Sequence, residues 1–146
     1  MKIGAVGLGN RIAHVYHELT KVNNEADLIA YVDPLPIGKE YAEKNNFFPS
    51  KKYSTLKEML SNEKLDLLMI GSPNHLHLEH IKIGLNAGVK MFAEKPIVID
   101  ENQSFELAKL LGEFGHDQVL VGLVLRYSQH ARSVRNLIDK NILGKI

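Results

Sequence analysis

The chain has 146 residues, of which 45% are hydrophobic and 24% charged, and its formal net charge is +1. This is the size and composition of one globular domain. The basic residues are scattered, so electrostatics give no reason to expect a nucleic-acid or membrane partner. The sequence has no cysteine, which excludes disulfides, thiolate metal sites, iron–sulfur clusters and a cysteine nucleophile.

No segment approaches the roughly 18 apolar residues of a transmembrane helix. The apolar run near the N-terminus is short and broken by glycine, unlike the core of a secretory signal. We therefore expect a soluble cytoplasmic protein.

Short apolar runs alternate along the chain with segments of helical periodicity. Strands are predicted over residues 2–6, 28–32, 51–53, 65–70, 89–93 and 119–125. Helices are predicted over 11–22 and 37–45, from 56 after a cap at Ser54 or Thr55, and over 75–87, 101–114 and 127–141. Gly88 stands where a left-handed helix end is expected, and residues 143–146 look like the opening of a further strand.

This alternation predicts an α/β fold of parallel βαβ units, with helices on both faces of one sheet. We expect a doubly wound Rossmann fold with strand order 3-2-1-4-5-6. Residues 1–125 would form the dinucleotide-binding domain. Residues 126–146 would form a last helix and the start of a second domain that the sequence does not include.

A glycine-rich segment, Gly7-Leu8-Gly9-Asn10-Arg11-Ile12, joins the first strand to the first helix. In the dinucleotide fingerprint the first glycine makes a tight turn, the second admits the pyrophosphate, and the third lets helix and strand pack closely. Ile12 replaces the third glycine, so we expect either an outward shift of the helix or close packing at Ala13. A glycine pair alone also fits a simple turn, but its position between strand and helix favours the fingerprint.

Asp33 ends the second predicted strand, where the fingerprint expects an acid that binds the ribose 2′-hydroxyl. A carboxylate there repels a 2′-phosphate, and the nearest basic residue in sequence is Lys39. The pattern therefore favours NAD over NADP. The alternative is that Asp33 only begins the turn that Pro34 continues.

Two more motifs follow predicted strands: Ser72-Pro73-Asn74-His75-Leu76-His77 and Ala93-Glu94-Lys95-Pro96. Together with the glycine segment, they resemble the Gfo/Idh/MocA oxidoreductase family, which includes inositol and other sugar dehydrogenases. The resemblance covers essentially the whole chain. It also implies a second domain, built on an antiparallel sheet, that supplies the substrate pocket and the acid–base residue.

The resemblance implies a role for each motif. The pyrophosphate would lie along Gly7, Leu8, Gly9, Asn10 and Arg11, and Asp33 would bind the adenosine ribose. The middle of the cofactor would be lined by Ser72, Pro73, Asn74 and His77. Glu94 and Lys95 would lie beside the nicotinamide ribose, with Lys95 also reaching the substrate hydroxyl as the catalytic residue, and Arg126 would lie near the nicotinamide end. An ordinary surface ion pair is the alternative for Glu94 and Lys95.

The leading functional hypothesis is the NAD-binding half of an oxidoreductase that acts on a sugar, a polyol or a related secondary alcohol, in a homo-oligomeric protein. Without the second domain, this chain alone is expected to be inactive. One alternative is a stand-alone dinucleotide-binding module with a regulatory role. Another is an S-adenosylmethionine site, although that interpretation leaves Lys95 without a task.

The histidines at 75, 77 and 80 are close in sequence, but they lack the His-Glu-x-x-His pattern of a zinc site. Partly exposed side chains at the start of a helix are the favoured interpretation, and no metal is expected.

Overall fold

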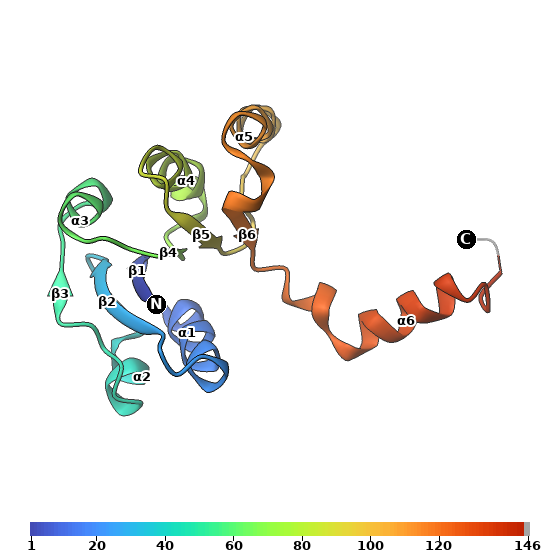
Figure 1. Ribbon diagram of the computed structural model, residues 1–146, viewed down its shortest axis with the longest axis horizontal. Helices are drawn as coiled ribbons and strands as arrows, with labels where there is room; N and C mark the ends of the chain where they lie inside the picture. Colours follow the sequence, from blue (N-terminus) through green and yellow to red (C-terminus); the bar gives the residue numbers. More distant parts are fainter. Residues whose placement is uncertain (145–146) are drawn as a thin grey trace.

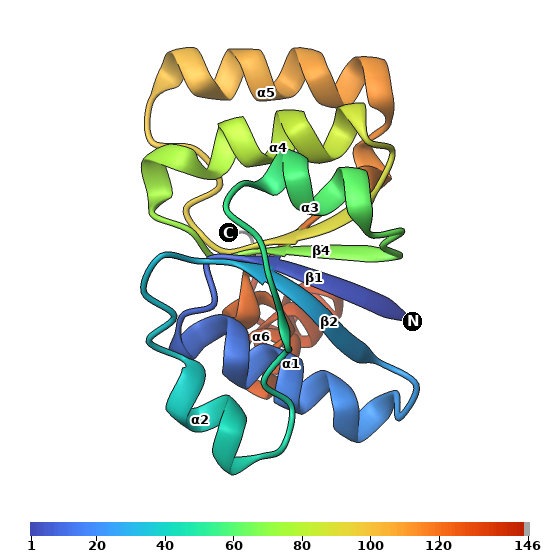
Figure 2. The ribbon, with the colours of Figure 1, turned by 90° about the vertical axis from the view of Figure 1, so that its left-hand side faces the viewer.

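A computed structural model describes residues 1–144 as a parallel sheet with helices on both faces (Figures 1 and 2). Its six strands lie in the order β3-β2-β1-β4-β5-β6. Their bounds are β1 Lys2–Val6, β2 Asp27–Val32, β3 Lys51–Lys52, β4 Leu67–Ile70, β5 Lys90–Ala93 and β6 Val119–Val121. All neighbouring pairs are parallel. The predicted doubly wound Rossmann topology is therefore confirmed.

Helices α1 and α2 cover one face of the sheet, and α3, α4 and α5 cover the other (Figure 2). The helix bounds are α1 Asn10–Val22, α2 Lys39–Lys44, α3 Leu56–Asn62, α4 His77–Asn86, α5 Glu101–Phe114 and α6 Gln129–Asp139. Two apolar clusters form the core. One contains Ile3, Ile12 and Tyr16, and the other contains Leu68 and Ile81. Because the central strands are buried on both faces, their sequences are nearly continuous apolar runs.

Side-chain oxygens that accept from main-chain amides mark where α3, α5 and α6 begin. Thr55 is the cap of α3, since its Oγ1 accepts from the amide of Glu58 at 3.1 Å. Glu58 in return accepts from the amide of Ser54 at 2.9 Å. Gly88 has φ +68°, as predicted for the end of α4, because a left-handed residue there carries the least strain when it has no side chain.

The predicted sixth strand is too long. β6 ends at Val121, and residues Val124–Tyr127 form a 3₁₀ helix. The partner strand β5 ends at Ala93, which pairs with Val121, so no strand remains beyond it to continue the ladder. The apolar run continues after β6, and its side chains at Leu123, Val124 and Leu125 are exposed.

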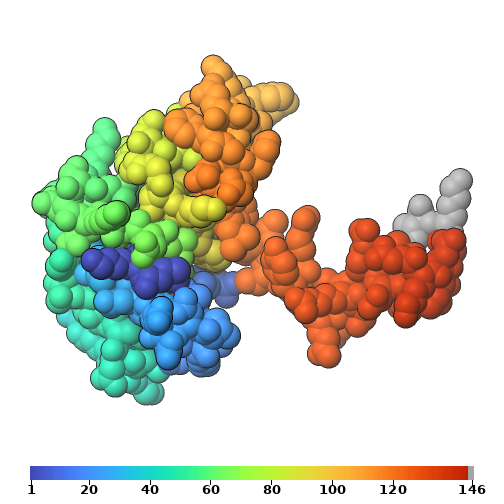
Figure 3. All heavy atoms as spheres, in the orientation of Figure 1, coloured from blue at the N-terminus to red at the C-terminus, as the bar shows by residue number. Residues whose placement is uncertain are grey.

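Helix α6 projects away from the sheet and its covering helices (Figures 1 and 3). It has no buried residue, and Val134, Leu137 and Ile138 are exposed on it. A further strand was expected to open over residues 143–146. Residues 141–143 form a turn instead, and residues 145 and 146 lie outside the described residues. Within the described part of the chain, no helix combines the length and apolarity needed to cross a membrane.

Candidate dinucleotide site

The motifs meet at the carboxyl edge of the sheet, because main-chain hydrogen bonds continue beyond the strands. The amide of Gly7 donates to Val32, and that of Gly71 donates to Val6, at 2.8 and 2.9 Å. The amide of Glu94 donates to Ile70 at 2.9 Å. Ligands of open parallel sheets bind at this edge, near the point where the strand order reverses.

The two glycines of the loop serve different purposes. Gly7 has φ +80°, and a Cβ there would collide with the main chain of Gly71 and Ser72. Gly9 precedes α1 with an ordinary φ of −78°, and a Cβ there would meet only Ile37 Cγ1, at 4.0 Å. The packing of the protein thus requires glycine at position 7 but leaves open space at position 9.

The first turn of α1 presents its main-chain amides at this opening. No side chain caps the helix, and the first turn contains no acidic residue. Amide groups at a helix N-terminus, together with the positive end of the helix dipole, favour an anionic group. Gly38 supports the loop from α2, since its amide donates to the carbonyl of Leu8 at 3.0 Å.

Ile12 is accommodated by a glycine on a neighbouring strand. Its side chain is buried, and a Cβ at Gly71 would collide with it. The absence of a side chain at the end of β4 therefore provides the space that the fingerprint usually gains from its third glycine. Ala13 is also fully buried, as expected for a close-packing residue.

Asp33 lies at the carboxyl end of β2, beside a groove of about 550 Å³. Its Oδ1 accepts from the amide of Leu35 at 2.8 Å, so it does begin a turn, as the alternative interpretation proposed. The groove is mostly apolar and runs from the glycine loop to the loop after β4. It is lined by Gly7, Gly9, Asp33, Leu35, Ile37, Ser72, Pro73, Leu76 and His80, among others.

The loop after β4 is stabilised by two histidines of α4. Ser72 Oγ lies 2.8 Å from His80 Nδ1. The His77 ring is buried, with Nε2 at 2.8 Å from the carbonyl oxygen of Ser72 and Nδ1 at 2.8 Å from that of Pro96. His77 was expected to line the cofactor, and it does border a cavity, but both its nitrogens are engaged by the main chain.

Burial lowers the pKa of His80 below its ordinary value of 6.5, with Glu79 raising it and His77 lowering it further. The lowered pKa keeps His80 neutral near pH 7. A neutral ring can both donate and accept through its two nitrogens, which suits a side chain that bonds a hydroxyl and borders the groove.

A second cavity, of about 540 Å³, lies where β4 and β5 end. Its lining includes Arg11, Ser72, Asn74, His77, Glu94, Lys95 and Val124. Arg11 Nε donates to Glu94 Oε1 at 2.9 Å, and the Glu94 side chain is only 9% exposed. The Glu94 carboxylate therefore forms its ion pair with Arg11 and not with the Lys95 ammonium group. It also accepts from the main-chain amide of Lys95 at 3.3 Å, whose side chain is exposed.

Three predicted site residues line neither cavity: Leu8, Asn10 and Arg126. The Leu8 side chain is fully buried in the core, so only its main chain faces the loop. Arg126 is exposed in the 3₁₀ helix after β6 and does not line either cavity. Asn10, at the start of α1, is exposed.

Sequence reasoning missed several residues that build the groove. Gly38 and Gly71 support the loop through contacts between segments far apart in the chain, which no local pattern reveals. Leu35 lies between a predicted strand and a predicted helix. Ile37 and Leu76 were expected inside helices, but α2 begins at Lys39 and α4 at His77. The side chains of Leu35 and Ile37 are 74% and 63% exposed. The histidines at 75, 77 and 80 were expected to be partly exposed at the start of a helix. This is wrong for His77, which is buried, and no pattern in the sequence indicated that His80 borders the groove.

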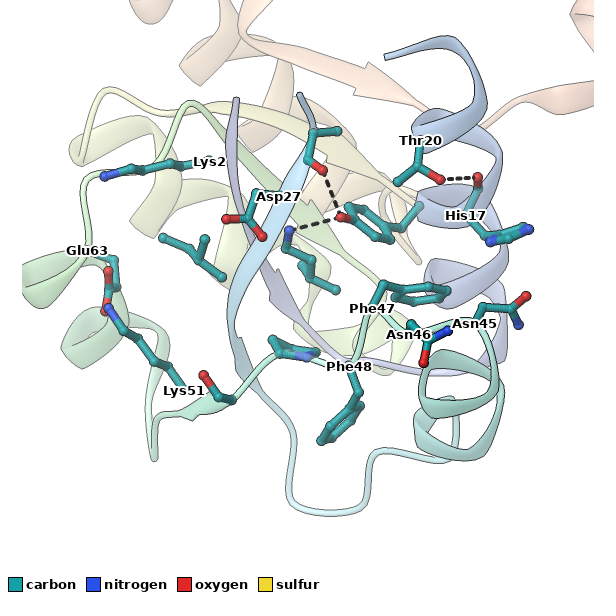
Figure 4. Close-up of a pocket in the computed structure, with 16 residues that line it drawn as sticks. Lys2, His17, Thr20, Asp27, Asn45, Asn46, Phe47, Phe48, Lys51 and Glu63 are labelled. Carbon is teal, nitrogen blue, oxygen red and sulfur yellow. Dashed lines mark hydrogen bonds and ion pairs between the residues drawn. The ribbon is translucent and has the colours of Figure 1, made fainter. Parts of the chain in front are cut away.

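A larger cavity, of about 710 Å³, lies near the amino ends of β1, β2 and β3 (Figure 4). Lys2, Asp27 and Lys51 begin those strands, and Lys51 forms an ion pair with Glu63 at 2.7 Å. Its position at the opposite edge excludes it as the site formed by the motifs. Within residues 1–144, no cluster of three or more histidine, cysteine or acidic side chains is arranged to hold a metal ion.

The topology and the glycine loop define a dinucleotide-binding Rossmann domain. Residues 1–123 match the family described as "Oxidoreductase family, NAD-binding Rossmann fold". The chain therefore belongs to the Gfo/Idh/MocA oxidoreductase family, and it contains the family's NAD-binding domain.

The relatives include the inositol 2-dehydrogenase/D-chiro-inositol 3-dehydrogenase of Lactiplantibacillus plantarum, which is 24% identical over 144 residues. The match covers 99% of this chain but 41% of that relative. The crystal structure of myo-inositol 2-dehydrogenase from Lactobacillus plantarum superposes with a TM-score of 0.85 and 27% identity, covering all of this chain and 43% of the other. The scyllo-inositol dehydrogenase from Lactobacillus casei with bound NAD(H) and scyllo-inositol gives 0.83 and 26%, with the same coverage.

Proposed function

We propose that the protein is an NAD-dependent oxidoreductase that transfers a hydride between nicotinamide and a secondary alcohol of a sugar or polyol. The family supports the reaction class, and the inositol dehydrogenases among the relatives support the substrate class. The observation that carries the proposal is the open space beside Gly9. No contact among residues 1–144 requires glycine there, whereas a closely approaching pyrophosphate does.

Each of the two cavities would hold one half of the dinucleotide. The apolar groove suits the adenosine half, with Asp33 accepting from the ribose hydroxyls and Leu35, Ile37 and Leu76 flanking the base. The pyrophosphate would cross the start of α1, over Gly7, Gly9, Asn10 and the main chain of Leu8. The middle of the cofactor would pass Pro73 and Ser72, which lines both cavities, and the nicotinamide half would lie in the second cavity beside Asn74.

Lys95 is the proposed catalytic residue of this chain. A bound nicotinamide would supply the hydride-transfer chemistry at its C4. An ammonium group beside the reacting carbon stabilises the alkoxide charge that develops on the substrate oxygen. Glu94 and Arg11 would lie beside the nicotinamide ribose. Arg126 would approach the nicotinamide end only if the segment after β6 is arranged differently in the whole protein.

We further propose that residues 1–125 form the cofactor domain and that 126–146 lead into a second domain that provides the acid–base residue. The chain spans 41% to 43% of the relatives' length, and the apolar side chains from Leu123 to Tyr127 are exposed, as expected for a surface that another domain covers. A cytoplasmic location and a homo-oligomeric assembly complete the proposal.

The test is a titration of the 146-residue chain with NADH and NADPH, followed by nicotinamide fluorescence. We expect tighter binding of NADH. Asp33→Ala should weaken NADH binding about tenfold, because it removes hydrogen bonds to a charged acceptor. It should also reduce the ratio between the dissociation constants of NADPH and NADH. Glu113→Ala, an exposed acid on α5, is the control. Failure to bind NADH at millimolar concentration would overturn the proposal.

A further inference from the structure

The His77 ring is enclosed by the protein and faces two acceptors. It begins α4, is only 1% exposed, and has both ring nitrogens 2.8 Å from main-chain carbonyl oxygens. One carbonyl belongs to Ser72, in the loop after β4. The other belongs to Pro96, in the loop after β5. The ring therefore bridges the two loops that border the second cavity.

A carbonyl oxygen can only accept a hydrogen bond, and a neutral imidazole has one donor nitrogen and one acceptor nitrogen. A neutral His77 would place a lone pair against one of the two oxygens at 2.8 Å. Both bonds are satisfied only when each nitrogen has a hydrogen. We propose that His77 is a buried imidazolium cation at neutral pH, which clamps the Ser72 and Pro96 loops together and thereby positions Lys95.

The charged groups around the ring act in both directions. The Glu94 carboxylate borders the same cavity and favours the cation, as does Glu79 on α4. Arg11 from α1, Lys95 from the end of β5 and the N-terminus of α4 oppose it. Because burial also disfavours a charge, the two short hydrogen bonds are the principal reason for the cation. His80, three residues later on α4, is the other titratable ring beside His77, and burial lowers its pKa.

The clamp connects to the chemistry through the main chain. Pro96 directly follows Lys95, so fixing the Pro96 carbonyl fixes the chain direction from which the Lys95 side chain extends. The role of His77 as a positioning residue rests on the proposed function, whereas its protonation does not.

The protonation is tested by ¹⁵N NMR of the histidine rings in the cofactor-free chain. At neutral pH we expect both His77 nitrogens to have directly bonded hydrogens that exchange slowly with water. The exposed ring of His75, two residues earlier, provides the reference within the same spectra. A His77 nitrogen without a hydrogen at pH 7, in a chain whose amide spectrum is that of the folded protein, would overturn the proposal.

The positioning role is tested by His77→Gln, with His75→Gln as the matched control. Gln is neutral, and its two N–H donors share one nitrogen, so they cannot span the two carbonyls as the separate ring nitrogens do. For a chain that remains folded by its amide spectrum, NADH affinity should fall about tenfold in His77→Gln and stay unchanged in the control. Unchanged affinity in both would contradict the clamp. If the unaltered chain does not bind NADH, the proposed function fails, and the NMR result alone decides the protonation.

Discussion

Substituting Gly9 and substituting Gly71 should have different effects on stability and on NADH binding. Gly9→Ala introduces no collision, so the free energy of unfolding should change by less than about 1 kcal/mol. NADH binding should nevertheless be lost or greatly weakened, because the methyl group occupies the space proposed for the pyrophosphate. Urea denaturation and the NADH titration measure the two effects separately.

Gly71→Ala is the matched comparison. Its methyl group would collide with the buried Ile12 side chain, so we expect a loss of roughly 1–3 kcal/mol in stability. If Gly9→Ala destabilised the chain as much as Gly71→Ala, the space beside Gly9 would be needed by the fold and not by a ligand.

His80 should make stability depend on pH. Its pKa is lowered in the folded state, so the unfolded chain binds this proton more readily. The stabilising contribution is complete above the ordinary value of 6.5 and is lost as the pH falls through the lowered value. We expect the urea midpoint to decrease from about pH 7 to about pH 5, with a smaller decrease in His80→Gln. His116→Gln, which alters an exposed ring, should retain the slope of the unaltered chain.

The residues that line the two cavities of the candidate site were predictable where one local pattern carries the signal. Gly7, Gly9 and Asp33 follow from the spacing of the fingerprint, and Glu94 from its motif. The partner of Glu94 was not predictable, because Arg11 lies 83 positions away in the chain. Gly71 was missed for the same reason, since its purpose depends on Ile12 in another element.

At the scale of elements, the cap of α3 makes a specific prediction. Thr55→Ala removes the side-chain acceptor for the Glu58 amide and should cost about 1 kcal/mol. Ser54→Ala is the control, since Ser54 contributes its amide to the cap and not its hydroxyl. A lower urea midpoint at unchanged slope measures the effect. Equal losses in both variants would contradict the role of the Thr55 hydroxyl.

Apolar runs located β1, β2, β4, β5 and β6, and the errors are at their ends. The short strand β3 was also predicted, although it consists of two exposed lysines. The strand predicted over 119–125 stops at Val121, because a strand needs a partner and β5 has ended. The helix predicted over 75–87 begins as a separate 3₁₀ turn at Asn74–Leu76. Hydrophobicity reports burial, but only pairing between distant segments decides where a ladder ends.

At the scale of the whole molecule, α6 leaves an apolar stripe without cover. Val134, Leu137 and Ile138 are 51%, 37% and 39% exposed. We expect the 146-residue chain to self-associate through this stripe, as measured by sedimentation velocity over a range of concentrations. Leu137→Lys should reduce association, whereas Asn136→Lys, which adds the same charge at an exposed neighbouring position, should not. A monomer at every concentration would contradict the prediction.

The short β6 also has a consequence for how such proteins diversify. The sheet contributes its last main-chain bond when the amide of Gly122 donates to Ala93, and everything beyond is joined to it through an exposed segment. A different partner module can therefore be attached after this point without repacking the interior. Under the proposed function, chimaeras joined at residues 123–127 should keep the coenzyme preference of this domain whichever module follows, as titrations with NADH and NADPH would measure.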